Sequence, residues 1–184
     1  MAAAERIWND DRPSEITLIE QFDYYGKLST QFPLPPLRIV YAASGTLPAA
    51  AIVLDGAIIE HAVYWAEIST DKEANYLAAI LNSETARKRV ESMQARGQWG
   101  ARHFDKVMFN LPIPRFNEKQ TLHRDLASAA AEAEKAAAAV ALPENMKFQR
   151  ARKLIRDALA AAGISQRIDN LVAQLLDGAK TNKN

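Results

Sequence analysis

Residues 69–83, STDKEANYLAAILNS, give the clearest secondary-structure signal in the chain. The Ser, Thr and Asp at the start can accept hydrogen bonds from the free backbone N–H groups of a first helical turn, and Glu73 lies within that turn. Leu77, Ile80 and Leu81 then recur at helical spacing. This pattern predicts a helix with one buried face that ends near Asn82 and Ser83.

The residues before this helix are typical of β-strands. Arg38–Tyr41, Ala50–Leu54 and Val63–Ile68 are predicted strands. Asp55 and Gly56 form a favoured hairpin dipeptide because both residue types tolerate positive φ, so residues 57–60 are predicted as the returning strand. We therefore expect a small antiparallel or mixed sheet.

The residues after the helix alternate between helical and loop character. Residues 84–96 are predicted as a second helix that Gly97 stops, followed by a loop and by a short strand at residues 107–109. From residue 117 onward, alanine-rich and amphipathic helical patterns follow. The expected fold class is α+β, a small antiparallel or mixed β-sheet with packed helices, followed by a C-terminal helical segment.

Three regions are expected along the chain. Residues 1–37 are an irregular lead-in with a short strand at Ile16, Leu18 and Ile19; the prolines near its end cannot donate hydrogen bonds within a central strand. Residues 38–116 are expected to form an α/β domain. Residues 117–184 are expected to form a helical C-terminal region, which Pro143 and Gly163 break into short pieces.

The composition is that of a globular protein, with 48% hydrophobic and 24% charged residues among 184. The absence of cysteine excludes disulfides, thiol nucleophiles and cysteine-ligated metal sites. No run approaches the roughly 20 apolar residues of a membrane span, and the N-terminus lacks the pattern of a signal peptide. We expect a cytoplasmic protein without a membrane partner.

The charges are unevenly distributed, although the formal net charge is only +1. Residues 1–84 contain five Lys/Arg and twelve Asp/Glu, a net charge of −7, whereas residues 85–124 contain nine and three, a net charge of +6. The last sixty residues contain nine and seven, a net charge of +2. A localised basic segment of this kind is typical of proteins that bind a polyanion.

The chain carries no pattern of catalytic residues. A methyltransferase that acts on an exocyclic amine needs an Asn/Asp-Pro-Pro-aromatic loop, and the tandem proline in Leu34-Pro35-Pro36-Leu37 has neither flank. The sequence also lacks a glycine-rich nucleotide loop after a strand, a nuclease-type acidic residue two positions before a lysine, and histidines at metal-ligand spacing. We expect no catalytic residue, metal site or cofactor in this chain.

The basic segment supplies the candidate binding residues. Arginine can pair with guanine and glutamine with adenine in the major groove, while lysine and arginine bind phosphates. Gly97 and Gly100 would let the backbone approach a phosphate closely. The same residues also suit a solvated helix face and a flexible loop, with Trp99 in the core. The residues predicted to contact DNA are Arg87, Lys88, Arg89, Arg96, Gln98, Trp99, Arg102, His103 and Lys106.

Two apolar motifs bracket this basic segment, YLAAILNS at Tyr76–Ser83 and FNLPIP at Phe109–Pro114. Together with Arg38–Gly45, Ala49–Val53 and His61–Trp65, they follow an order that resembles the TaqI-like C-terminal specificity domain of bacterial DNA methyltransferase and restriction-modification proteins. The likeness covers residues 38–125. It implies that residues 38–116 are a target-recognition-like domain, and that a separate upstream domain binds S-adenosylmethionine, flips the target base and methylates it.

The sequence features are compatible with two functions. The first is a sequence-specific DNA recognition module, the non-catalytic part of a restriction-modification or phage-defence DNA methyltransferase. Its partners would be double-stranded DNA and a methyltransferase or restriction catalytic domain or subunit. The alternative is a structural or protein-interaction domain that docks on a partner subunit through its C-terminal helices. An independent enzyme is the least supported function because no acid–base pair or nucleophile stands out.

Overall fold

The computed structural model describes residues 2–11, 16–42, 49–60, 62–91, 93, 96–97, 100–101 and 105–181. It confirms an α+β fold, in which a three-stranded antiparallel sheet is packed with helices and three further helices follow. In chain order the elements are α1 (Ala2–Asp11), α2 (Leu18–Phe22), η1 (Tyr24–Gly26), η2 (Ser29–Gln31), β1 (Arg38–Ala42), β2 (Ala50–Val53), β3 (Val63–Glu67), α3 (Asp71–Asn82), α4 (Glu84–Glu91), β4 (Arg96–Gly97), β5 (Gly100–Ala101), η3 (Asp105–Asn110), α5 (Thr121–Ala138), α6 (Phe148–Ala161) and α7 (Ile164–Thr181).

Strand β1 is the centre of the sheet, whose order is β2-β1-β3. Both neighbours run antiparallel to it, so Tyr41 lies opposite Ala50 on one side and Tyr64 on the other. Because side chains alternate along a strand, Ile39 and Tyr41 share one face, and both are buried in the core. Helix α3 packs across this face of the sheet.

One hydrophobic core joins the sheet to the helices. Helix α3 packs against α5, and α5 packs against α7, so the C-terminal helices share the core of the sheet region. The apolar residues of the helix predicted at residues 69–83 are thus buried by the sheet on one side and by α5 on another. The fully buried apolar side chains at the centre are those of Ala74, Tyr76, Ile80, Ala86, Val90, Met108, Leu126, Val172 and Leu176.

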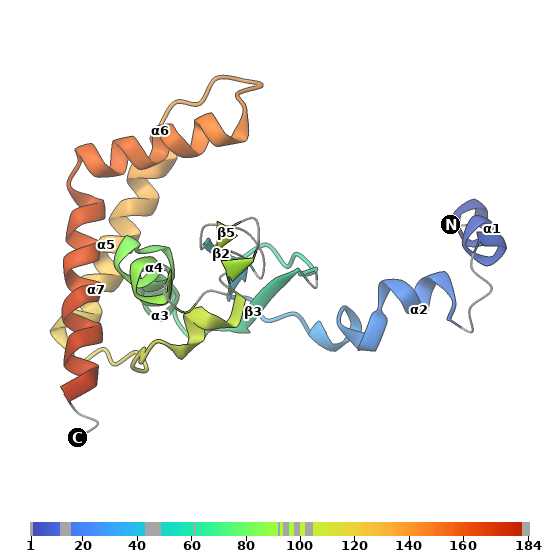
Figure 1. Cartoon of the computed structure of the whole chain (residues 1–184), viewed down its shortest axis with the longest axis horizontal. Helices are drawn as coiled ribbons and strands as arrows, with labels where there is room; N and C mark the ends of the chain where they lie inside the picture. Colours follow the sequence, from blue (N-terminus) through green and yellow to red (C-terminus); the bar gives the residue numbers. More distant parts are fainter. Residues whose placement is uncertain are drawn as a thin grey trace.

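The C-terminal helices form an angular unit at one end of the molecule (Figure 1). Helices α5 and α7 lie beside the core, and α6 crosses their ends. Gly163, with φ +71°, follows α6 and lets the chain turn into α7, because a left-handed conformation is readily adopted only by glycine. Among the described residues, no helix combines the length and the apolar character needed to cross a bilayer.

The N-terminal residues extend away from the sheet, and α1 and α2 lie at the opposite end of the molecule from α7 (Figure 1). The short strand expected at Ile16, Leu18 and Ile19 is wrong, because residues 18–22 form α2. The reason is a capping box. The N–H of Glu20 donates to Thr17 Oγ1 at 3.2 Å, and the N–H of Thr17 donates to Glu20 Oε2 at 2.8 Å.

The strand expected at residues 57–60 does not form, and β2 pairs with β1 instead. The backbone of Ile59 is bound by a side chain, because Gln31 Nε2 donates to its carbonyl at 2.7 Å and its N–H donates to Gln31 Oε1 at 2.8 Å. Residues 107–109 lie in the 3₁₀ helix η3 rather than in a strand, which buries Met108 completely. Helix α4 ends at Glu91, earlier than the expected Arg96, which lies in β4.

Candidate nucleic-acid interface

Helix α4 carries three of the predicted contact residues, and Ser83 fixes where it starts. The buried hydroxyl of Ser83 donates a hydrogen bond to the carbonyl of Ile80 at 2.9 Å and accepts one from the N–H of Ala86 at 3.0 Å. One side chain therefore satisfies both the last turn of α3 and the first turn of α4. This double cap sets the direction in which α4 leaves α3.

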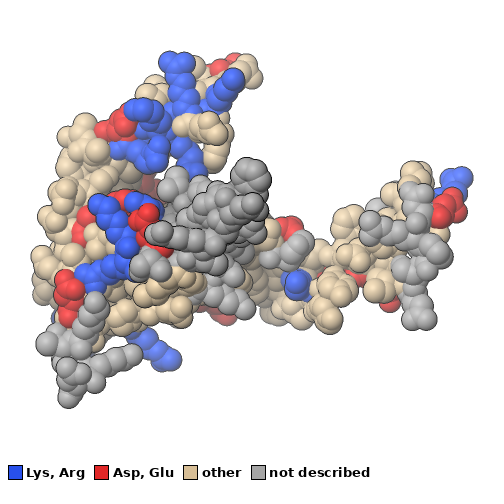
Figure 2. Space-filling view, viewed as in Figure 1, with Lys and Arg blue, Asp and Glu red and all other residues tan. Residues whose placement is uncertain are grey.

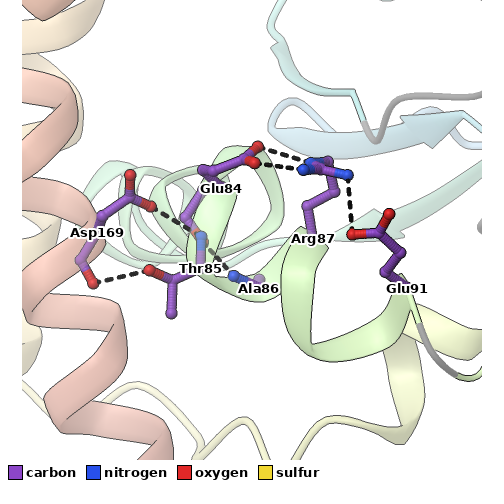
Figure 3. Close-up of polar contacts among 7 residues, drawn as sticks. Glu84, Thr85, Ala86, Arg87, Glu91 and Asp169 are labelled. Carbon is purple, nitrogen blue, oxygen red and sulfur yellow. Dashed lines mark hydrogen bonds and ion pairs between the residues drawn. The ribbon is translucent and has the colours of Figure 1, made fainter.

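Helix α4 is attached to α7 near both of its ends. The N–H of Thr85 donates to Asp169 Oδ1 at 2.9 Å, and the Thr85 hydroxyl donates to the Asp169 carbonyl at 3.1 Å (Figure 3). Near the other end, Arg89 Nη2 lies 2.7 Å from Asp177 Oδ1. The predicted contact residue Arg89 is thus engaged by a carboxylate of the neighbouring helix.

Arg87 lies between two glutamates of its own helix (Figure 3). Its Nε donates to Glu84 Oε2 at 2.6 Å and its Nη1 donates to Glu91 Oε2 at 3.3 Å, and a further bond joins Nη2 to Glu84. These hydrogen bonds lower the pKa of Glu84 below its ordinary value and raise the pKa of Arg87. Lys88 is exposed and forms no ion pair with any described residue. Lys88 therefore carries the free charge of this helix.

The remaining predicted contact residues follow α4. Arg96 lies in β4, opposite Ala101 of β5, in a two-stranded antiparallel ladder, and Lys106 lies in η3. The structure describes the backbone of these two residues. Gln98, Trp99, Arg102 and His103 lie outside the described residues. Their contribution to a DNA-binding surface stays a prediction.

The two apolar motifs that bracket the basic segment are joined by a hydrogen bond. The Tyr76 hydroxyl, on α3, donates to the carbonyl of Pro114 at 3.0 Å. The Tyr76 ring also stacks on His123, with the ring centroids 4.7 Å apart. Burial raises the pKa of the Tyr76 phenol and lowers the pKa of the His123 imidazole, because each charged form would lose its hydration. The hydrogen bond therefore holds the two motifs together on either side of the basic segment.

His123 is a buried histidine in a defined tautomer. Its Nδ1 accepts a hydrogen bond from the N–H of Asn117 at 3.0 Å, so the proton of the neutral ring is on Nε2. Nε2 is buried and has no hydrogen-bond partner among the described residues. This environment favours the neutral ring, because protonating Nδ1 would remove the acceptor that Asn117 uses.

Arg38 is a fully buried arginine at the start of β1, and no sequence pattern distinguishes it from the other residues of that strand. None of its three guanidinium nitrogens has a hydrogen-bond partner among the described residues. Glu67 lies directly opposite on β3, but it is exposed, and no ion pair joins the two. A buried cation without a partner costs several kcal/mol of desolvation in a typical protein.

Positive charge on the face shown in Figure 2 lies mainly over two elements, α6 and α4. Five Lys/Arg and one Asp occupy residues 147–161, a net charge of +4 that the average over the last sixty residues concealed. The signal in the sequence was the recurrence of Arg152 and Arg156 one turn apart on an amphipathic helix. These residues are not among the DNA contacts predicted from the sequence.

No group of three or more His, Asp or Glu side chains within the described ranges is placed to hold a metal ion. Comparisons with protein-family models, curated proteins and solved structures gave no match to this chain.

Proposed function

We propose that this chain is a sequence-specific DNA recognition module, the non-catalytic part of a bacterial restriction-modification or phage-defence DNA methyltransferase. It would work in the cytoplasm with double-stranded DNA and with a methyltransferase or restriction catalytic domain or subunit. The proposal starts from the order of the motifs between residues 38 and 125, which resembles the TaqI-like specificity domains.

The observation that carries the proposal is that the hydrophobic core holds the basic segment at both ends. Residues 85–124 hold nine Lys/Arg against three Asp/Glu, and they begin at the Ser83 cap. The chain returns to the core at Met108 and Leu111, which are both buried. A basic segment whose two ends are held by one core is well suited to present side chains to a duplex, because fixed ends remove part of the ordering cost of binding.

Binding to duplex DNA tests this proposal directly. The full chain should select a preferred sequence from a random duplex library, and the affinity for that sequence should fall as salt rises. Arg96→Ala and Arg102→Ala should each weaken binding, and loss of a phosphate contact should reduce the salt slope by about 1. Lys135→Ala, which removes an exposed cation on α5, is the matched control and should leave both quantities unchanged. Unchanged binding in both arginine variants would refute their assignment.

A second candidate function, a structural or protein-interaction domain, is favoured by one observation. Large apolar side chains are exposed along the N-terminal residues, with Tyr25 at 82% and Phe22 at 65% exposure. An open depression beside α2 is lined by Ile16, Ile19, Glu20, Asp23, Tyr24 and Tyr25. Exposed apolar patches of this kind often mark protein contacts. A stable oligomer at micromolar concentration in light scattering, without duplex binding, would favour this function over DNA recognition.

A further inference from the structure

Helix α6 has two different faces. Ala151, Ile155, Ala158 and Leu159 are half-buried and lie on the side that packs against α5 and α7. Arg150, Lys153 and Arg156 recur every three residues on the opposite side, and Lys147 precedes the helix as its N-cap. No residue of α6 is fully buried, so the helix adds little to the core compared with its neighbours.

The basic side chains of α6 are mostly free of ionic partners. Lys153 pairs with Asp157 at 2.6 Å, and Arg152 lies over the ring of Phe148 at 5.5 Å. Within the described part of the chain, no carboxylate pairs with the other three, which are exposed. These three are Lys147, Arg150 and Arg156.

Helix α4 presents the opposite case. Arg87 is bound by Glu84 and Glu91, and Arg89 is bound by Asp177. An arginine that already donates to carboxylates must give up those bonds before it can donate to a phosphate, whereas an unpaired arginine loses only water. The readily available positive charge is therefore greater on α6 than on α4.

Both helices contribute to the same face of the molecule (Figure 2). Each of them contacts α7, so their relative position is set by a common neighbour. A duplex is a continuous polyanion with one charge per about 1.7 Å of its axis. A duplex bound at α4 can therefore also reach α6, which lies on the same face.

We propose that α6 is a second, sequence-independent contact element for the phosphate backbone of double-stranded DNA, through Arg150 and Arg156. The proposal rests on the proposed function and deepens it, because phosphate contacts position a protein while base contacts specify the sequence. Duplex DNA is favoured over an anionic membrane as the occupant. A membrane-binding helix inserts a continuous apolar face, and here Ile155 and Leu159 pack toward α5 and α7, which leaves only Phe148 and Leu154 as exposed large apolar residues of α6.

The test compares the full chain with the double variant Arg150→Gln/Arg156→Gln. The matched control is Arg6→Gln/Lys27→Gln, which removes two exposed cations of the N-terminal residues and gives the same net charge. Duplex affinity is measured as a function of salt for the selected sequence and for a scrambled one. The α6 variant should bind both duplexes more weakly, on the order of tenfold at moderate salt, with a salt slope shallower by about 2. Circular dichroism should show unchanged helix content, because both arginines are exposed.

The possible failures are distinguishable. If the wild type binds duplex and selects a sequence but the α6 variant matches the control, this inference is wrong and the proposed function stands. If the variant changes the sequence preference, α6 reads bases and the sequence-independent role is wrong. If the wild type binds no duplex but binds phosphatidylserine vesicles through Arg150 and Arg156, both the proposed function and this inference fail. If it binds neither, both fail as well.

Discussion

The side-chain amide of Asn82 makes two hydrogen bonds with the backbone of Ala50. Asn82 Nδ2 donates to the Ala50 carbonyl at 3.0 Å, and the Ala50 N–H donates to Asn82 Oδ1 at 2.9 Å. Ala50 lies at the start of β2, an outer strand of the sheet. The end of α3 therefore takes the place that a further strand would occupy and satisfies part of an open sheet edge.

Replacing Asn82 should destabilise the fold. Asn82→Ala removes two exposed hydrogen bonds to the backbone of Ala50, so we expect a loss of about 0.5–1.5 kcal/mol per bond in urea unfolding. Asn75→Ala is the control, because the one partner of the Asn75 side chain among the described residues is the Asp71 carbonyl of its own helix. Amide exchange at Ala50 should also accelerate in the first variant. Equal stability of the two variants would contradict the bridging role.

Arg38→Met should stabilise the chain. The substitution removes a buried guanidinium that has no hydrogen-bond partner among the described residues and keeps most of the side-chain volume, so we expect a gain of about 1–4 kcal/mol, the range seen when buried ion pairs are replaced by apolar residues. Chemical denaturation measures the change. Glu67→Gln serves as the control, since the two side chains are opposite each other in the sheet but form no ion pair. Destabilisation by both substitutions would show that Arg38 and Glu67 pair in solution.

His123 should make stability depend on pH in the neutral range. Burial lowers its folded pKa below 6.5, so between these values the unfolded chain binds the proton and the folded chain does not. The free energy of unfolding therefore decreases as pH falls through 6.5 toward the folded pKa, by at most about 1.4 kcal/mol per pH unit. Unfolding of the wild type and of His123→Gln at several pH values measures this slope. The two other histidines remain in both proteins, so an identical slope would contradict the assignment to His123.

Releasing Arg87 should strengthen duplex binding. In Glu84→Gln/Glu91→Gln, the guanidinium keeps neutral partners but loses both carboxylates, so it competes less with a phosphate. We expect higher affinity and a steeper salt dependence. Part of this gain comes from the change in net charge alone. Adding Arg87→Gln to the double variant should abolish the remainder, and an undiminished gain would exclude Arg87 as a contact.

The elements with a strong periodic signal were predicted well. The helix of residues 69–83 and the strands around Arg38–Tyr41 and Ala50–Leu54 all occur, because burial of one face by the core enforces their periods. The misses have different causes. At residues 18–22 the capping box of Thr17 and Glu20 is a local pattern that favours a helix over the expected strand, whereas at residues 57–60 the backbone found a partner remote in the sequence. Gln31 binds the backbone of Ile59, 28 positions away, and no local pattern at residues 57–60 could indicate it.

The candidate site was predicted less completely than the fold. Counting charges located the basic segment, but a count cannot tell a free arginine from a paired one. Asp169 and Asp177 bind α4 from more than 80 positions away. The basic face of α6 was concealed for the opposite reason, because its charges were averaged with the acidic residues of α5 and α7.

The hydrogen bond between Tyr76 and Pro114 has a mechanical consequence. Tyr76 lies in α3 and Ser83 caps the end of the same helix, so this bond and the Ser83 cap tie both ends of residues 84–114 to one helix. A rotation of α3 would therefore carry both ends of that stretch with it.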